Sequence, residues 1–128
     1  VAWVKARQTF GKPLASNQAI QFRLAELSTD YELVKALTLN VAALIDTMSK
    51  ADVAKRISDK VAMCNYRANQ LACRAADEAI QLHGGMGYSR HKQFENHYRQ
   101  HRRYRITEGS DEMQLRKIAG VLLGYIGG

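Results

Sequence analysis

Apolar residues recur every three or four positions through two long stretches of this sequence, and this spacing constrains the fold more than any other feature. Such a repeat places apolar side chains along one face of an α-helix. The first stretch has polar residues between its apolar ones and predicts an amphipathic helix of about 30 residues. Its apolar positions are Ile20, Leu24, Leu27, Tyr31, Val34, Leu37, Val41 and Leu44, and those of the second stretch are Val53, Ile57, Val61, Cys64, Ala68, Leu71, Ala75, Ala79 and Leu82.

Turn and cap residues predict where these two helices begin and end. A Gly-Lys-Pro turn at 11–13 precedes Ser16 and Asn17, either of which can cap the first helix. A polar break at 47–50 separates the two stretches. The sequence His-Gly-Gly at 83–85 ends the second helix, with a glycine in the left-handed cap position.

The rest of the chain predicts two shorter helices. One is expected at about 91–99 and is followed by a connecting segment at 100–109. Ser110 then caps a last helix that extends to about Tyr125, before a glycine tail at 127–128. The predicted fold is all-α, a four-helix up-and-down bundle with two long antiparallel helices. A two-stranded coiled coil is the competing interpretation of the spacing, but the shorter helices supply more packing partners than a coiled coil needs.

Composition agrees with one folded domain and excludes several classes of protein. Of the 128 residues, 46% are hydrophobic and 24% are charged, which is typical of a globular chain and not of a disordered one. A single proline is too few for a turn-rich β-sandwich. No apolar run approaches the roughly 18 residues of a membrane span. The chain begins at Val1 with no initiator Met and no signal-peptide pattern, so we expect a piece of a longer protein.

The two cysteines, Cys64 and Cys73, are nine positions apart on one predicted helix. Their Cα atoms would lie about 13.5 Å apart along the helix axis. A disulfide tolerates no more than about 7 Å between its Cα atoms. We therefore expect two reduced core thiols, which is typical of a cytosolic or matrix protein.

Glu108 is the candidate catalytic residue. It lies in the segment 106–110, Ile-Thr-Glu-Gly-Ser, just before the last predicted helix. A carboxylate in a partly desolvated loop can have its pKa raised toward the working pH and serve as a general base. Gly109 beside it lets a substrate backbone or thioester approach closely. The alternative is a solvated acid placed near the positive end of a helix dipole.

Three glycines follow the second long helix within the segment 81–87, Gln-Leu-His-Gly-Gly-Met-Gly. A helix cap and a turn account for Gly84 and Gly85. A third glycine so close to them suggests a backbone kept bare for contact with another molecule. The segment is not a dinucleotide-binding fingerprint, because no strand precedes it and no phosphate-binding helix follows in the right place.

Residues 90–105 form a basic segment in a chain whose formal net charge is +7. Arginines in this pattern could contact the phosphates of nucleic acid, CoA or a dinucleotide, and the interleaved tyrosines could stack on bases. A solvated face, or Arg–carboxylate pairs at a subunit interface, is the ordinary alternative. The segment holds Arg90, Lys92, Arg99, Arg102, Arg103 and Arg105 against one acid, Glu95, with Tyr98 and Tyr104 between them.

Two further patterns are weaker. His97 and His101 share a helix face, but no third ligand stands at a usual spacing, so no metal site is predicted. Near the start, Arg7 could bind a pyrophosphate and Phe10 could pack on a cofactor ring. An ordinary hydrophobic contact at the helix entry would also explain Phe10.

Taken in order, these motifs resemble the C-terminal helical domain of acyl-CoA dehydrogenases. The similarity begins with Arg-Gln-Thr-Phe-Gly-Lys-Pro-Leu at 7–14 and continues through the glycine segment to Tyr88. It ends with Tyr-Arg at 98–99, the Glu108 segment, and Glu-Met-Gln at 112–114. The resemblance covers essentially all 128 residues. It implies that this domain follows an N-terminal helical domain and a middle β domain, both absent here.

The resemblance also implies a role for each site residue. Glu108 matches the family's catalytic base, which removes the α-proton of an acyl-CoA thioester while the β-hydride goes to FAD, and Gly109 lies beside the substrate. Ser110 stands where Thr is common, Glu112 where Gln is common, and Gln100 where the family has an acid. The residues implied to contact FAD of a neighbouring subunit are Arg7, Phe10, Asn17, Gln18, Gln81, Leu82, His83, Gly84 and Gly85, and those implied to contact FAD of the same subunit are Ser110 and Glu112.

The implied partners are an acyl-CoA substrate, an electron-transfer flavoprotein and further copies of the chain in a dimer or tetramer. The implied location is the bacterial cytoplasm or the mitochondrial matrix. We predict that the 128 residues alone fold but turn over no substrate. The alternatives are an acyl-CoA oxidase or flavin monooxygenase of the same superfamily, a basic helical nucleic-acid-binding module, and a purely structural oligomerisation bundle.

Overall fold

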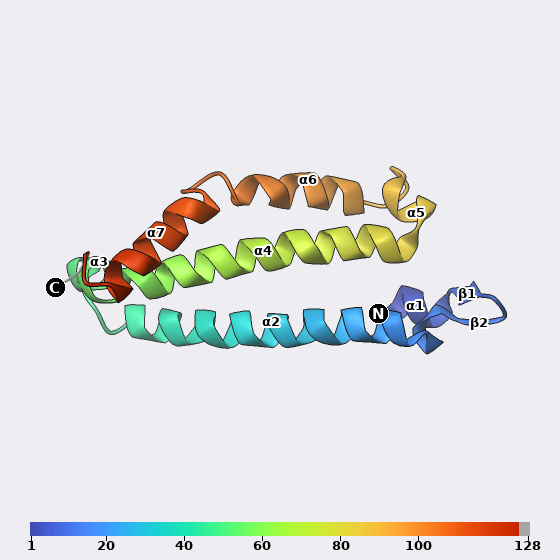
Figure 1. The fold of residues 1–128 in the computed structure, drawn as a ribbon, viewed down its shortest axis with the longest axis horizontal. Helices are drawn as coiled ribbons and strands as arrows, with labels where there is room; N and C mark the ends of the chain where they lie inside the picture. Colours follow the sequence, from blue (N-terminus) through green and yellow to red (C-terminus); the bar gives the residue numbers. More distant parts are fainter. Residues whose placement is uncertain (126–128) are drawn as a thin grey trace.

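The computed structural model describes residues 1–125, and its regular structure is almost entirely helical (Figure 1). Two long helices, α2 (Gln18–Ile45) and α4 (Ser58–His83), run antiparallel and side by side. The predicted all-α class and the predicted long antiparallel pair are confirmed. The remaining elements are α1 (Ala2–Ala6), an antiparallel hairpin of β1 (Gln8–Thr9) and β2 (Lys12–Pro13), the 3-10 turn η1 (Leu14–Ser16), α3 (Lys50–Arg56), α5 (Gly85–Tyr88), α6 (Phe94–Tyr104) and α7 (Asp111–Leu122).

Helix α4 is the centre of the molecule. Helix α2 packs along one side of it, and α6 and α7 follow one another along the other side (Figure 1). With 11 and 12 residues, α6 and α7 are each less than half as long as the 26-residue α4, so the two together cover its length. The four helices of the predicted bundle are present. Within this one chain they flank a central helix and do not close around a common core.

The first long helix begins where its cap residue predicts, whereas the second apolar stretch forms two helices. Asn17 caps α2, because its Oδ1 accepts a hydrogen bond of 2.9 Å from the backbone N–H of Ala19. The second apolar stretch divides at Ile57, which has φ −135° and ψ 17° and separates α3 from α4. Ile57 is buried with Ser58 at this corner. Tertiary packing therefore breaks the helix where no Gly or Pro marks a break.

The later helix boundaries also differ from the prediction. Helix α6 begins at Phe94 and reaches Tyr104, so the connecting segment is shorter than expected. Helix α7 ends at Leu122, and the predicted tail at 127–128 lies outside the described residues. Ser110 does occupy the N-cap position of α7, but its side chain makes no capping hydrogen bond.

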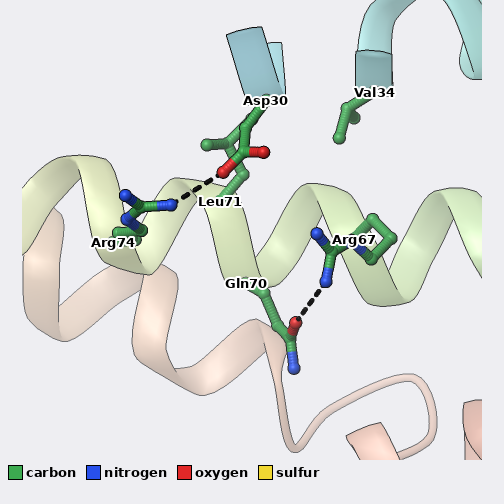
Figure 2. A pocket seen from close by; sticks show the side chains of 6 residues that line it. All are labelled: Asp30, Val34, Arg67, Gln70, Leu71 and Arg74. Atoms are coloured by element: carbon green, nitrogen blue, oxygen red, sulfur yellow. Dashed lines mark hydrogen bonds and ion pairs between the residues drawn. The ribbon is translucent and has the colours of Figure 1, made fainter. Parts of the chain in front are cut away.

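Ion pairs fix the register of α2 against α4. Arg74 on α4 pairs with both Glu26 and Asp30 on α2, and its Nη1 lies 2.7 Å from Asp30 Oδ2 (Figure 2). Arg23 on α2 pairs in the other direction with Glu78 at 3.3 Å. Asp30 and Arg74 also line a small cavity of about 140 Å³ between the two helices.

The buried core of the described residues is thin. It consists of small and medium side chains, and none of the large side chains is fully buried. Large apolar side chains on α2 are exposed instead, including Phe22 at 58%, Leu33 at 64% and Leu39 at 62%. Exposed apolar side chains of this size are common where another protein surface covers a helix.

Both cysteines are free thiols on α4, as predicted. Burial raises the pKa of the Cys73 thiol, which keeps it protonated and unreactive at neutral pH. Within residues 1–125, no helix combines the length and the apolar character that crossing a bilayer requires.

Candidate functional site

Predicted site residues from the segment before α2 and from the end of α4 meet around one cavity of about 410 Å³, which we call the end cavity. It lies where α4 gives way to α5, beside α1 and the β1–β2 hairpin (Figure 1). Residues more than 70 positions apart in the sequence therefore share a surface. The cavity is lined by Trp3, Arg7, Thr9, Leu14, Gln81, Leu82, His83, Gly84, Gly85 and Met86.

Aromatic stacking builds the wall of the end cavity. The Trp3 ring stacks on the His83 ring with 4.7 Å between centroids, and the His83 ring also lies 4.4 Å from the Phe94 ring, tilted by 41°. The indole N–H of Trp3 donates to the Leu82 carbonyl at 2.9 Å. His83 Nδ1 lies 2.7 Å from the Ala79 carbonyl, so Nδ1 carries a proton and donates. These contacts fasten α1 to the end of α4.

The floor of the end cavity is bare backbone. Gly84 has φ +60°, and neither Gly84 nor Gly85 has an atom within 4 Å of the place where a Cβ would stand. Arg7 is exposed, and its guanidinium makes no ion pair or hydrogen bond with any residue in 1–125. Phe10 stands fully exposed at the hairpin tip with φ +51°. A free cation, open backbone and a free aromatic ring thus lie at one end of the molecule.

Asn17 and Gln18 stand apart from the lining of the end cavity. The Asn17 side chain is engaged in capping α2, and Gln18 begins that helix with an exposed side chain. The sequence pattern grouped these two residues with Arg7. The structure places them beyond the hairpin, on the surface of the same end of the molecule.

Glu108 lies in a second region, the loop of residues 106–110 between α6 and α7, which we call the Glu108 loop. Its backbone has φ +64°, a conformation that a residue with a side chain rarely adopts, and Gly109 follows with φ +93°. Gln114 on α7 holds this turn, since its Nε2 donates to the carbonyls of Glu108 at 3.0 Å and Gly109 at 3.2 Å. Strained backbone that neighbouring groups hold in place is common at functional sites.

The Gln114 contacts were not anticipated from the sequence. Gln114 belongs to the motif that follows the loop, yet only the structure shows its amide beneath both carbonyls. A Cβ on Gly109 would come within 2.9 Å of the Gln114 Nε2 atom. The positive φ favours glycine at position 109, and a Cβ there would also displace the Gln114 amide.

The Glu108 carboxylate is exposed and makes no hydrogen bond or ion pair within the described part of the chain. The expected partial desolvation is thus not supplied by this chain alone. Of the two residues that the resemblance implies to contact FAD of the same subunit, Ser110 is half-buried and Glu112 is exposed on the first turn of α7. Hydrogen bonding from the Ser110 hydroxyl lowers the pKa of Glu112.

The two regions lie on different parts of α4. The end cavity adjoins Leu82, whereas the Glu108 loop lies over Gln70, whose Nε2 is 3.5 Å from Asp111 Oδ2 just after the loop. Twelve helical positions correspond to about 18 Å along the axis. One chain therefore carries two separate groups of candidate residues.

Comparison with known proteins identifies the architecture that carries both groups. The family model described as acyl-CoA dehydrogenase, C-terminal domain, matches residues 1–123. This chain belongs to the acyl-CoA dehydrogenase family.

Relatives within this family have names that differ in reaction. Over 123 residues, the chain is 37% identical to the mitochondrial short-chain specific acyl-CoA dehydrogenase of Bos taurus and to the 3-(aryl)acrylate reductase of Clostridium sporogenes. It is 33% identical to subunit CarC of the caffeyl-CoA reductase–Etf complex of Acetobacterium woodii. Each alignment covers 96% of this chain but only 28–31% of the relative. The chain thus spans less than a third of the length of these relatives.

Solved structures of family members show the same fold. The butyryl-CoA dehydrogenase of Megasphaera elsdenii matches with a TM-score of 0.82 and 33% identity, over 95% of this chain and 30% of that one. The acyl-CoA dehydrogenase of Geobacillus kaustophilus gives a TM-score of 0.82 and 34% identity, over 94% of this chain and 30% of that one.

The basic segment of this acyl-CoA dehydrogenase domain is partly neutralised by contacts within the chain. Arg99 lies 3.8 Å from Glu95 one helical turn earlier, and Arg103 lies over the Tyr104 ring. The Gln100 side-chain amide donates to Asn96 at 3.5 Å. His97 and His101 share a face as predicted, with 6.1 Å between ring centroids.

Proposed function

We propose that this chain is the C-terminal domain of a longer FAD-dependent acyl-CoA dehydrogenase, and that Glu108 is the base that removes the α-proton of an acyl-CoA thioester. The observation that carries the proposal is the backbone of the Glu108 loop. Two successive residues with positive φ, held by Gln114, present a carboxylate that the chain itself does not pair. Residues held in such conformations cluster at functional sites.

In the proposed reaction the Glu108 carboxylate takes the α-proton of the thioester and becomes a carboxylic acid. The α-carbon electron pair forms the new α,β double bond as hydride leaves the β-carbon. FAD, when bound, accepts that hydride and so supplies the oxidising power that no side chain has. Gly109 is the proposed substrate contact beside the carboxylate, and because its Cβ position faces the Gln114 amide at 2.9 Å, it would meet the thioester through its backbone.

The end cavity fits part of FAD. Arg7 can pair with a phosphate, the open backbone at Gly84 and Gly85 permits close approach, and Phe10 can lie against a flat ring. A cavity of about 410 Å³ is too small for the whole dinucleotide. We therefore assign this end to one portion of the FAD of a neighbouring subunit, and Ser110 and Glu112 to the FAD of the same subunit.

The exposed apolar surface of α2 supports an assembly larger than this chain. Phe22, Leu33 and Leu39 project from α2, and the proposal covers them with the other domains of the full-length protein or with further copies in a dimer or tetramer. This is also why the 128 residues are expected to fold but not to turn over substrate. Electron-transfer flavoprotein is the proposed acceptor, and one relative is itself named as a subunit of an Etf complex. The proposed location is the bacterial cytoplasm or the mitochondrial matrix.

A second candidate is the reverse reaction, reduction of an α,β-unsaturated thioester. It is favoured by the reductase names of two relatives that match as well as the short-chain dehydrogenases do. In that direction a protonated Glu108 would deliver a proton to the α-carbon. Both directions require the same carboxylate, so they differ in the substrate and in the direction of proton transfer, and not in the residue that transfers the proton.

The test is anaerobic absorption spectroscopy of the full-length protein. Saturated and α,β-unsaturated acyl-CoA thioesters are added to the oxidised and the photoreduced protein in turn. Bleaching of the oxidised flavin by a saturated thioester supports the dehydrogenase, and reoxidation of the reduced flavin by an unsaturated one supports the reductase. Glu108→Gln should retain flavin but abolish its absorption change with the thioesters. Asp77→Asn removes a negative charge from an exposed position on α4 and should leave that absorption change as in the parent protein.

Two results would contradict the proposal. A full-length protein without flavin, or a flavin that responds to no acyl-CoA, would leave a shared fold only. Oxygen consumption during turnover would instead indicate the oxidase or monooxygenase alternative.

A further inference from the structure

Two charged residues enclose the Glu108 loop symmetrically. Arg105 is the C-cap residue of α6, three positions before Glu108, and Asp111 is the first residue of α7, three positions after Glu108. Arg105 Nε and Nη2 both bind Asp111 Oδ2, at 2.7 and 2.6 Å. The Asp111 backbone N–H also donates to the Arg105 carbonyl at 3.2 Å. The loop is thus closed at its base by a side-chain pair and a backbone bond between the same two residues.

This ion pair is among the more buried pairs of the molecule. The Arg105 and Asp111 side chains are 32% and 12% exposed, close to those of the Lys60–Asp59 pair, whereas Arg99 in another pair is 74% exposed. Hydrogen bonding to Asp111 raises the pKa of Arg105. Exposed pairs contribute little, but removing one partner of a buried pair leaves an uncompensated charge. The Arg105–Asp111 pair therefore has the strength to hold a backbone conformation.

Helix α4 anchors the closed loop to the rest of the domain. Gln70 Nε2 lies 3.5 Å from the same Asp111 Oδ2 atom, and Gln70 Oε1 accepts from Arg67 at 3.4 Å. Figure 2 shows the Gln70 side chain turned away from α2 toward the ribbon on the other side of α4. The base of the loop is fixed to the central helix, while Gln114 fixes its apex.

We propose that Arg105 and Asp111 form a clamp that positions the Glu108 carboxylate, with Gln70 anchoring the clamp to α4. This inference rests on the proposed role of Glu108. Neither clamp residue contacts the reacting atoms, so both are positioning residues. The clamp maintains the positive φ values at Glu108 and Gly109, which a loose loop would relax. It also neutralises Asp111, so that Glu108 is the free carboxylate of the loop.

The test measures full-length Arg105→Ala, Arg105→Lys and Asp111→Asn for kcat, KM, flavin content and melting temperature. Misplacement of a reacting group by about 1 Å can cost about 100-fold in rate. Arg105→Ala should therefore lower kcat by about 10- to 100-fold with KM and flavin content unchanged. Arg105→Lys keeps a charged donor within reach of Asp111 and should recover most of the loss. Arg56→Ala is the matched control, because Arg56 is an exposed arginine on α3.

Amide hydrogen exchange provides a measurement that does not depend on turnover. In Arg105→Ala, exchange within 106–110 should accelerate by about tenfold or more, while α2 exchanges as in the parent protein. Unchanged loop exchange would overturn the clamp. Faster loop exchange with kcat within about twofold of the parent would overturn its positioning role. If Arg105→Ala does not fold, loop exchange and kcat are measured on Asp111→Asn, with Asp46→Asn as control. The same outcomes then support or overturn the clamp.

Glu108→Gln, measured in parallel, separates this inference from the proposed function. If Glu108→Gln turns over normally, the proposed function fails, whatever the loop does. If Glu108→Gln is inactive while Arg105→Ala is fully active, the proposed function stands and the clamp fails.

Discussion

The end cavity and the Glu108 loop are built in opposite ways. The end cavity joins α1 and the hairpin to the end of α4, through contacts such as the hydrogen bond from Trp3 to Leu82, 79 positions away. The Glu108 loop is held mainly by residues within six positions, namely Arg105, Asp111 and Gln114. One region is a surface with open backbone and a free cation, and the other is a strained turn that presents one carboxylate.

This contrast fits two different tasks. Binding a large cofactor requires area, free donors and a flat ring surface, and these tolerate small displacements. Proton transfer requires one group within hydrogen-bond distance of one atom, which demands fixed geometry. If the account is right, changes at the end cavity alter cofactor retention and stability, whereas changes at the Glu108 loop alter rate.

The largest expected effect on stability comes from Trp3→Ala in the end cavity. The substitution removes the stack on His83 and leaves the Leu82 carbonyl without its donor. We expect the 128-residue chain to lose about 2–3 kcal/mol of unfolding free energy, less than for a fully buried Trp because Trp3 is half-buried. Chemical denaturation measures this loss. Lys5→Ala, an exposed change on α1, should cost under about 0.5 kcal/mol, and an equal loss in both would refute the role of Trp3.

Two glycines with similar backbone conformations allow a matched test between the regions. Gly109 has φ +93° and the Gln114 amide 2.9 Å from its Cβ position, whereas Gly11 in the hairpin has φ +75° and open space. Gly109→Ala should cost about 2 kcal/mol, and Gly11→Ala about 1 kcal/mol from backbone strain alone. The full-length Gly109→Ala should also lose turnover, and Gly11→Ala should not. Equal effects on turnover would erase the proposed division between the regions.

Arg7→Ala should weaken FAD binding in the full-length protein without changing the rate constant of the saturated enzyme. A charge-assisted hydrogen bond to phosphate is worth about 1.5 kcal/mol, or roughly tenfold in Kd. Fluorescence titration of the apoprotein with FAD measures the change. Lys5→Ala removes a nearby positive charge outside the cavity and serves as the control. An unchanged Kd would remove Arg7 from the cofactor site.

The smallest expected effect is on acid stability near the loop. The Ser110 hydroxyl lowers the pKa of Glu112, so the stabilisation exists above the ordinary Glu pKa of about 4.3 and disappears as pH falls through the lower folded-state value. The parent chain should therefore lose slightly more stability than Ser110→Ala between about pH 5 and pH 3. Melting curves across this range measure the difference, with Ser28→Ala on α2 as control. Parallel pH profiles for the parent and Ser110→Ala would contradict the assignment.

Much of this molecule follows from local sequence patterns, and its exceptions have physical causes. Three- and four-residue spacing predicts α2 and α4, and Asn17 caps α2 as its side chain suggests. No Gly or Pro marks the break at Ile57. Burial of the Ile57 side chain at the corner between α3 and α4 determines the break instead. Helix α6 begins at Phe94 and not at about 91, and the Phe94 ring packs against His83, a contact that a single segment of sequence does not reveal.

The candidate site is likewise predicted in part by sequence motifs and shown in part only by the structure. Motif resemblance selects Glu108 and Gly109, and the structure adds the positive φ values that make their positions unusual. The same resemblance groups Asn17 with Arg7, yet the Asn17 side chain is engaged in the helix cap. The contacts of Arg105 and Gln114 depend on how α6, α4 and α7 meet, so no local pattern predicts them.

The most direct test of the account is exchange of the α-hydrogen of an acyl-CoA whose β-carbon carries no hydrogen, such as the 3,3-dimethylbutanoyl thioester. This compound cannot be dehydrogenated, so exchange with deuterated water, followed by mass spectrometry, reports proton removal alone. The account predicts exchange by the full-length protein and a loss of about 100-fold or more in Glu108→Gln. Equal exchange by the parent protein and Glu108→Gln would contradict the assignment of Glu108 as the base.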